Sequence, residues 1–245
     1  MPALALHLAP SLARPEDLAG GVAVVIDLLR ASTTICFALH AHAAAVRPCE
    51  EIDEARRIAS ELPARMVALG GERGGVKIDG FDLGNSPAEY TEPAVRDRAI
   101  VFTTTNGTRA LRVAAAADRV LVGCLANLSA VVSAAWATQR PIHLVCAGVL
   151  GQPCLDDTLA AGAIAAAVER RAGAPLADDN AILAADLWSR HGTSRTALSA
   201  ILRRSAGGRN LVGVGLASDI DLCTRIDTAP VVPELHKADW YIRPQ

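Results

Sequence analysis

The chain has 245 residues, of which 51% are hydrophobic and 20% charged, and its formal net charge is −2. This composition fits a globular protein with a substantial core and excludes a disordered chain. The charge balance gives no basic footprint for nucleic acid, and the apolar stretches are too short to span a membrane.

Cysteine usage and the N-terminus bear on the compartment. The six cysteines form no Cys-x-x-Cys pair, so we expect reduced thiols in the core rather than disulfides or a zinc site. The N-terminus lacks the basic segment followed by an apolar one that a signal peptide requires. We therefore expect a cytoplasmic protein.

Apolar runs that predict strands alternate with helical patterns along most of the chain. Strands are predicted at residues 4–8, 22–26, 45–48, 66–69, 99–102, 120–123, 142–146 and 231–233, with an edge strand at 240–242. Helices are predicted at residues 35–41, 52–62, 128–137, 158–171, 180–190, 194–203 and 217–223, and one more ends at residue 117. This alternation indicates a three-layer α/β/α fold with a largely parallel or mixed sheet, in a single domain over residues 1–245. Residues 172–223 lack strand signals, which predicts a helical cap in the C-terminal third.

Residues 70–91 form the most unusual segment of the chain. Six glycines fall in its first fifteen residues, with charges of both signs between them. Glycine allows the backbone to take positive φ angles or to pass close to a ligand. The segment closes on Asn85-Ser86-Pro87, a cap residue followed by proline at the first helical position, which argues against disorder. A solvated connecting loop is the alternative, although loops of this length are usually functional or disordered.

Polar clusters follow four of the predicted strands. They lie at residues 27–34, 70–85, 103–109 and 148–157. In an open parallel sheet, ligands bind beyond the carboxyl ends of the strands. The first and third clusters also place hydroxyl and backbone N–H groups at a helix start beside an arginine, a geometry that binds phosphate or another anion. Threonine and asparagine also cap helices without binding a ligand, so that structural role stays open for residues 104–108.

Several carboxylates accompany these clusters. Asp27 ends an apolar strand, where a charged group has no structural need to be, and it is our first choice for a catalytic acid. Hard oxygen ligands beside phosphate groups suit Mg²⁺. Asp156 and Asp157 can instead complement the dipole at a helix start, and for Asp156 we favour that role. Metal binding, general-base catalysis and phosphorylation all stay open for Asp27.

Other catalytic classes lack their signatures. The sequence has no phosphate-binding loop of the G-x-x-x-x-G-K-[ST] type, no G-x-S-x-G nucleophile elbow and no H-E-x-x-H zinc motif. Cys146 has no evident base partner, which disfavours a thiol nucleophile. The first strand lacks a G-x-G-x-x-G turn, so a dinucleotide-dependent oxidoreductase is also disfavoured.

Taken together, these segments resemble a known family. The resemblance is carried by Val25-Ile26-Asp27-Leu28-Leu29-Arg30-Ala31-Ser32-Thr33-Thr34, Gly71-Glu72-Arg73-Gly74-Gly75, Gly84-Asn85-Ser86-Pro87, Thr103-Thr104-Thr105-Asn106-Gly107-Thr108, Cys146-Ala147-Gly148, the segment 156–163 and Asp221-Leu222-Cys223. They are similar to the corresponding parts of the 2-phosphosulfolactate phosphatases, the ComB-type family. The resemblance implies an α/β/α hydrolase that uses Mg²⁺ to convert (R)-2-phospho-3-sulfolactate to 3-sulfolactate, a step toward coenzyme M. It also implies a homo-oligomer, for which we expect a dimer.

The resemblance and the residue chemistry together suggest roles in the site. The expected catalytic residues are Asp27, Arg30 and Glu72. The expected metal ligands are Asp27, Glu72, Asp82 and Asp157. The residues expected to hold a small anionic, phosphorylated substrate are Ser32, Thr33, Thr34, Arg73, Lys77, Asn85, Thr104, Thr105, Asn106, Gly107, Thr108 and Arg109. Arginine suits the bidentate recognition of oxyanions.

Two departures from the family pattern leave alternatives. Gly148-Val149-Leu150-Gly151-Gln152 lacks the more polar residues expected after the Ala-Gly pair, and Asp156-Asp157 stands where Glu-Asp is usual. The departure at residues 148–152 bears on which substrate is bound. The departure at Asp156-Asp157 replaces one carboxylate by another. The alternatives are a phosphatase of another small 2-phospho-carboxylic acid and a non-catalytic module that binds an anionic metabolite. Dependence on a metal separates the enzyme from the module.

Overall fold

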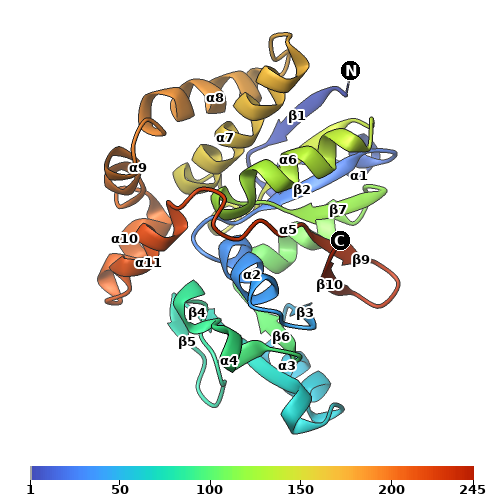
Figure 1. Ribbon diagram of the computed structural model, residues 1–245, viewed down its shortest axis with the longest axis vertical. Coiled ribbons are helices and arrows are strands. Elements are labelled where there is room, and N and C mark those ends of the chain that lie inside the picture. The colour runs from blue at the N-terminus through green and yellow to red at the C-terminus, as the bar shows by residue number, and fades with distance from the viewer. Residues whose placement is uncertain (1) are drawn as a thin grey trace.

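The computed structural model describes residues 2–245, which form ten strands and eleven α-helices (Figure 1). The strands are β1 (Leu4–His7), β2 (Val22–Ile26), β3 (Ala45–Cys49), β4 (Val67–Arg73), β5 (Val76–Lys77), β6 (Ala99–Thr103), β7 (Arg119–Val122), β8 (Ile142–Cys146), β9 (Pro233–His236) and β10 (Tyr241–Pro244). The helices are α1 (Pro15–Leu18), α2 (Ala31–His40), α3 (Ile52–Ser60), α4 (Glu92–Val95), α5 (Gly107–Ala114), α6 (Leu128–Ala137), α7 (Leu155–Ala172), α8 (Asp179–His191), α9 (Arg195–Leu202), α10 (Ala206–Gly213) and α11 (Ala217–Cys223).

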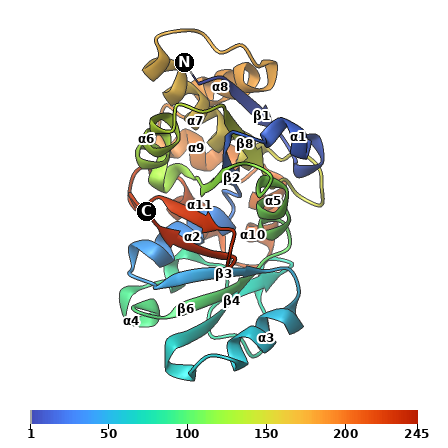
Figure 2. The ribbon, with the colours of Figure 1, turned by 90° about the vertical axis from the view of Figure 1, so that its right-hand side faces the viewer.

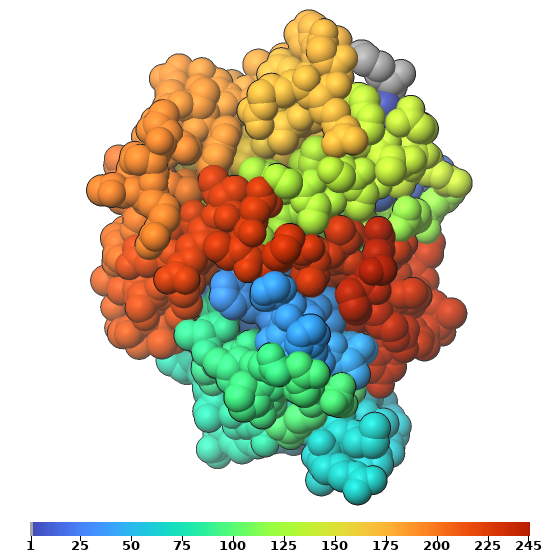
Figure 3. All heavy atoms as spheres, viewed as in Figure 1, coloured from blue at the N-terminus to red at the C-terminus, as the bar shows by residue number. Residues whose placement is uncertain are grey.

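The strands form one mixed sheet in the order β1-β8-β2-β7-β9-β10-β3-β6-β4-β5. β1, β8, β2 and β7 run parallel to one another, as do β3, β6 and β4. The hairpin β9–β10 joins these two parallel blocks and pairs antiparallel with β7 on one side and β3 on the other. Figure 2 shows the hairpin between the two blocks, and in Figure 3 the chain leading to it crosses the face of the molecule. The expected α/β class with a mixed sheet is therefore confirmed.

Helices cover both faces of the first block. In β2, Val22, Val24 and Ile26 contribute to one hydrophobic core together with residues of α6 and α7. Ala23 and Val25 contribute to a second core together with residues of α2 and α5. Since successive residues of a strand point to opposite faces, β2 is buried on both sides, as its continuous apolar run predicts. The result is the three-layer α/β/α arrangement.

Residues 172–223 are largely helical, as their few strand signals predict. Helices α8 to α11 follow one another between residues 179 and 223 and lie together at one side of the molecule (Figure 1). The sequence patterns predict α8, α9 and α11, whereas no pattern predicts α10. Within residues 2–245, no helix is both long and apolar enough to cross a membrane.

Two predictions about strands are corrected by the structure. Residues 240–242, expected at an edge, contribute to β10, which lies inside the sheet between β9 and β3. The strand expected at 66–69 continues to Arg73, through the first glycines of the following segment. A Cβ atom on Gly71 would lie 2.1 Å from the carbonyl oxygen of Thr103 in β6, so glycine is required where these strands approach. The glycines therefore serve strand pairing as well as the loop.

The contact between α7 and α8 provides a test of this packing. A Cβ atom on Gly162 would lie 2.0 Å from the carbonyl oxygen of Ala184, a backbone atom that cannot easily move aside. We expect Gly162→Ala to lower the free energy of unfolding by about 1–3 kcal/mol, the usual cost of overpacking, as measured by urea unfolding. Gly213→Ala is the matched control, because among residues 2–245 a Cβ atom there meets nothing within 4 Å beyond its chain neighbours and the backbone of its own helix. Equal destabilisation by both substitutions would contradict the packing.

Candidate active site

A cavity of about 530 Å³ lies where the chain segments after β2, β4, β6 and β8 meet. These are the four polar clusters that the sequence places at strand ends, and α10 contributes a further wall. The residues that line the cavity are Asp27, Leu29, Arg30, Glu72, Arg73, Gly74, Gly75, Asn85, Thr104, Thr105, Asn106, Val149, Leu150, Ala206, Gly207, Asn210 and Leu211. The fold therefore brings together many of the residues expected in the site.

Asp27 follows directly on β2 and is buried at the cavity wall. Its carboxylate accepts one hydrogen bond, of 3.2 Å, from the backbone N–H of Ala31 at the start of α2. The pKa of Asp27 is raised to about 7, mainly by burial and also by the charges of Asp156 and Glu72, while the Ala31 bond and Arg30 lower it. Burial and the neighbouring carboxylates therefore outweigh the effect of Arg30 on the pKa of Asp27.

Glu72, near the end of β4, ties two segments together. One oxygen of its carboxylate accepts the backbone N–H of Gly75 at 2.7 Å. The other oxygen accepts both the backbone N–H and the hydroxyl group of Thr105, each at 3.0 Å. Both oxygens are occupied by protein donors, so Glu72 shapes the wall by holding the segment after β6 against the glycine-rich segment.

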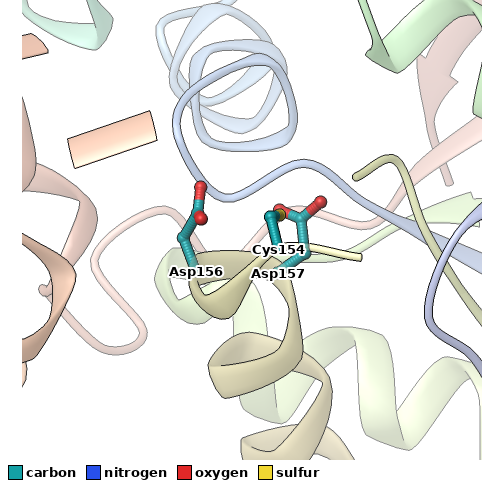
Figure 4. Close-up of side chains that lie close together, drawn as sticks. All are labelled: Cys154, Asp156 and Asp157. Carbon is teal, nitrogen blue, oxygen red and sulfur yellow. The ribbon is translucent and has the colours of Figure 1, made fainter. Parts of the chain in front are cut away.

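The first turn of α7 supplies two further buried carboxylates. Figure 4 shows Asp156 and Asp157 pointing toward the segment that joins β2 to α2, with Cys154 beside them; ligand atoms of the three lie within 4.8 Å of one another. Asp157 accepts the backbone N–H groups of Leu28 and Gly148, both at 2.8 Å, so it joins the ends of β2 and β8. The Oδ1 atom of Asp156 is buried and has no hydrogen-bond partner within residues 2–245. Burial raises the pKa of both carboxyl groups.

Two arginines line the cavity and are held in place by the protein. Arg30 donates to Asp219 of α11 and to the carbonyl oxygen of Gly75, both at 2.7 Å. These contacts use two of the five N–H donors of a guanidinium group, so Arg30 can still donate into the cavity. Arg73 donates to two backbone carbonyl oxygens and to one hydroxyl group, which commits it to the surrounding backbone.

The hydroxyl groups of residues 32–34, expected to cradle phosphate, do not line this cavity. Ser32 accepts the backbone N–H of Asp27, and Thr33 and Thr34 donate to backbone carbonyl oxygens. Thr108 likewise donates to a backbone carbonyl oxygen. These segments are buried, so the hydroxyl groups satisfy backbone groups that water does not reach.

Residues 104–106 do line the cavity, immediately before α5. Gly107 lets this helix begin against the β2 segment, because a Cβ atom there would lie 2.9 Å from Oδ2 of Asp27. Asn85 also faces the cavity, and its buried Oδ1 atom has no hydrogen-bond partner in the described part of the chain. N–H and O–H donors thus stand near unpartnered oxygens, a mixture that fits an anion and a cation side by side.

Four further expected residues also lie outside the cavity. Asp82, expected as a metal ligand, is exposed away from the cavity and accepts the backbone N–H of Leu69 in β4. Lys77 is exposed in β5. Arg109 lines a smaller neighbouring cavity. Asp157 accepts two backbone N–H groups and so holds the segment after β2 against the segment after β8.

Sequence reasoning missed two contributors to the site. Asp156, for which the sequence favoured a role in complementing the helix dipole, contributes a charge that raises the pKa of Asp27. Its position next to a second acid was the available signal. The other contributor is helix α10. It passes so close to Asp156 that a Cβ atom added to Gly207 would lie 2.8 Å from Oδ2 of Asp156. No sequence pattern indicates this helix.

Known proteins resemble this chain over most of its length. Residues 7–238 match the family model described as 2-phosphosulpholactate phosphatase. A relative from Symbiobacterium thermophilum, named a probable 2-phosphosulfolactate phosphatase, is 44% identical over 221 residues, which are 89% of this chain and 92% of the relative. Relatives with the same name from Caldanaerobacter subterraneus and a Synechococcus strain are 37% and 40% identical, over 90% and 91% of this chain and 90% of each relative.

The crowding of carboxylates around Asp27 leads to a test of stability against pH. Because the pKa of Asp27 is raised in the folded protein, its ionisation between about pH 4 and 7 favours the unfolded chain. In the presence of a chelator, we expect Asp27→Asn to raise the melting temperature at pH 8 and to have a smaller effect at pH 5. Asp82→Asn, at an exposed carboxylate, should change neither value. A lower melting temperature for Asp27→Asn than for the wild type at pH 8 would contradict the electrostatic account.

Proposed function

Because the chain belongs to the 2-phosphosulfolactate phosphatase family, we propose that it hydrolyses (R)-2-phospho-3-sulfolactate to 3-sulfolactate and phosphate. The enzyme class is that of the phosphoric monoester hydrolases. The observation that carries the proposal is the cavity, whose wall combines Arg30, Thr104 and Asn106 with the buried carboxylates Asp27 and Glu72. Such a site suits a phosphate ester, because the donors bind its oxygens while the carboxylates hold a cation.

Mg²⁺ is the cation that we propose for this site. Asp27 and Asp156 would hold it, because both are buried and the Oδ1 atom of Asp156 has no protein partner among the described residues. Glu72 and Asp157, which the sequence analysis expected as ligands, already accept protein donors with both oxygens and would act as supports. The ion prefers hard oxygen ligands and, when bound, would neutralise charge on the phosphoryl group.

The protein groups would position the ester for attack by water. Arg30, fixed by Asp219, would bind phosphoryl oxygens with its remaining donors. Thr105 is itself held by Glu72, so this part of the wall is already in place before substrate binds. Helix α10 covers the cavity and would limit the access of water. Phosphoryl transfer depends mainly on positioning and electrostatic stabilisation of this kind.

Phosphate release with Mg²⁺ and with a chelator is the direct test. We expect the wild-type protein to release phosphate from 2-phospho-3-sulfolactate only when the metal is present. Asp27→Asn should lower the rate by more than about 100-fold, because it removes one of the two carboxylates that would hold the metal ion. Glu72→Gln should lower it by about 10- to 100-fold, because the supporting carboxylate loses an acceptor.

Asp82→Asn is the control, since this exposed carboxylate lies outside the cavity and should be replaceable without loss of activity. Folded Asp27→Asn and Glu72→Gln proteins with full activity would refute the assignment. Release without preference for the sulfonated substrate over 2-phospholactate would keep the phosphatase and change its substrate. No release from either compound would favour a module that only binds an anionic metabolite.

A further inference from the structure

A second cavity, of about 250 Å³, adjoins the one described above. Ser11 and Arg109 belong to its wall, and it shares Thr105, Asn106 and Leu150 with the larger cavity. These three residues form a partition with one cavity on each side. A ligand seated at the partition can therefore reach into both cavities.

The partition is held by hydrogen bonds of its own. The Oδ1 atom of Asn106 accepts the backbone N–H of Leu150 at 3.2 Å. Val149 and Gln152 close the turn that contains Leu150 by exchanging two backbone hydrogen bonds, of 2.9 and 3.0 Å. Thr105 is fixed from the side of the larger cavity by its hydrogen bond to the carboxylate of Glu72. The smaller cavity is therefore shaped by the same contacts that shape the larger one.

The two cavities differ in charge. The larger cavity has Asp27 and Glu72 on its wall beside Arg30 and Arg73. Among the residues that the structure describes, the wall of the smaller cavity contains no acidic residue, and its charged residue is Arg109. Within residues 2–245, the guanidinium group of Arg109 makes no hydrogen bond or ion pair, whereas both arginines of the larger cavity are held by protein acceptors. The smaller cavity thus offers an anion an uncommitted cation.

We infer that the smaller cavity is the subsite for the sulfonate group of the substrate, with Arg109 as the residue that determines specificity for it. This inference rests on the proposed function. The phosphate oxygen and the sulfonate of 2-phospho-3-sulfolactate are carried by adjacent carbon atoms, so one molecule can place them on the two sides of the partition. Sulfonate is negatively charged at neutral pH and needs no metal, which matches a wall with arginine and no carboxylate. A guanidinium group can donate two parallel N–H bonds to such an oxyanion.

Two substrates that differ in the sulfonate test the inference. 2-Phospho-3-sulfolactate and 2-phospholactate share the phosphate and the carboxylate, so a role of Arg109 in binding either of those groups affects both. We expect Arg109→Gln to lower the ratio of their kcat/KM values by about 10- to 100-fold, the effect of a hydrogen bond to a charged group. Arg109→Lys should recover part of the ratio, because it restores the charge without the two parallel donors.

Arg112→Gln is the matched control, since Arg112 lies one turn further along α5 and is already paired with Glu50. Its ratio should equal that of the wild type. An unchanged ratio in Arg109→Gln, or an equal loss on both substrates, would overturn the inference.

Calorimetric titration with 3-sulfolactate and with lactate separates this failure from a failure of the proposed function, because binding needs no turnover. If Arg109→Gln binds 3-sulfolactate more weakly than the wild type but binds lactate equally well, the result supports the subsite. This holds even if the wild type releases no phosphate. Equal binding of 3-sulfolactate by Arg109→Gln and the wild type overturns it.

Discussion

The buried ion pair between Arg30 and Asp219 holds the cavity together. Their charged atoms lie 2.7 Å apart, and each side chain is 2% exposed. Asp219 also accepts the hydroxyl group of Ser86, and Arg30 also donates to the carbonyl oxygen of Gly75, so three distant parts of the chain meet at one point. Charges buried this deeply are tolerated only when each has its partner. Because α11 is fixed in this way to the segment after β2, the preceding helix α10 is kept over the cavity.

The carboxylates of the site divide into two kinds by their hydrogen bonds. Glu72 and Asp157 accept protein donors with both oxygens, so their burial is compensated within the fold. Asp27 and Asp156 are buried with fewer donors, which is unfavourable for the protein alone. A cation that binds between them would offset that cost and so stabilise the folded state by mass action. The buried carboxylates Asp27 and Asp156, where a cation would bind, therefore destabilise the folded protein on its own. Glu72 and Asp157, which hold the loops, do not.

Much of the fold, and part of the site, could be predicted from local patterns. The run Val22–Ile26 marks a strand covered on both faces, and the polar clusters mark a cavity because parallel strands end together. The position of β10 could not be predicted, because pairing between strands distant in sequence leaves no local pattern. Helix α10 contains several glycines, which oppose helix formation, and packing of Leu211 in the core overrides that propensity. At the site, sequence patterns could not assign different roles to Asp156 and Asp157. These adjacent acids at one helix start differ only in their neighbours in space.

The hairpin β9–β10 stands in the middle of the sheet although it comes last among the strands along the chain. During synthesis, both parallel blocks leave the ribosome before the strands that join them. Until residues 233–244 follow, β7 and β3 present open edges to any other strand they meet. Asp27 and Glu72 come from different blocks, and the hairpin joins the strands of those blocks into one sheet. The continuity of the sheet beneath the site thus depends on two short strands that contain none of the residues lining the larger cavity.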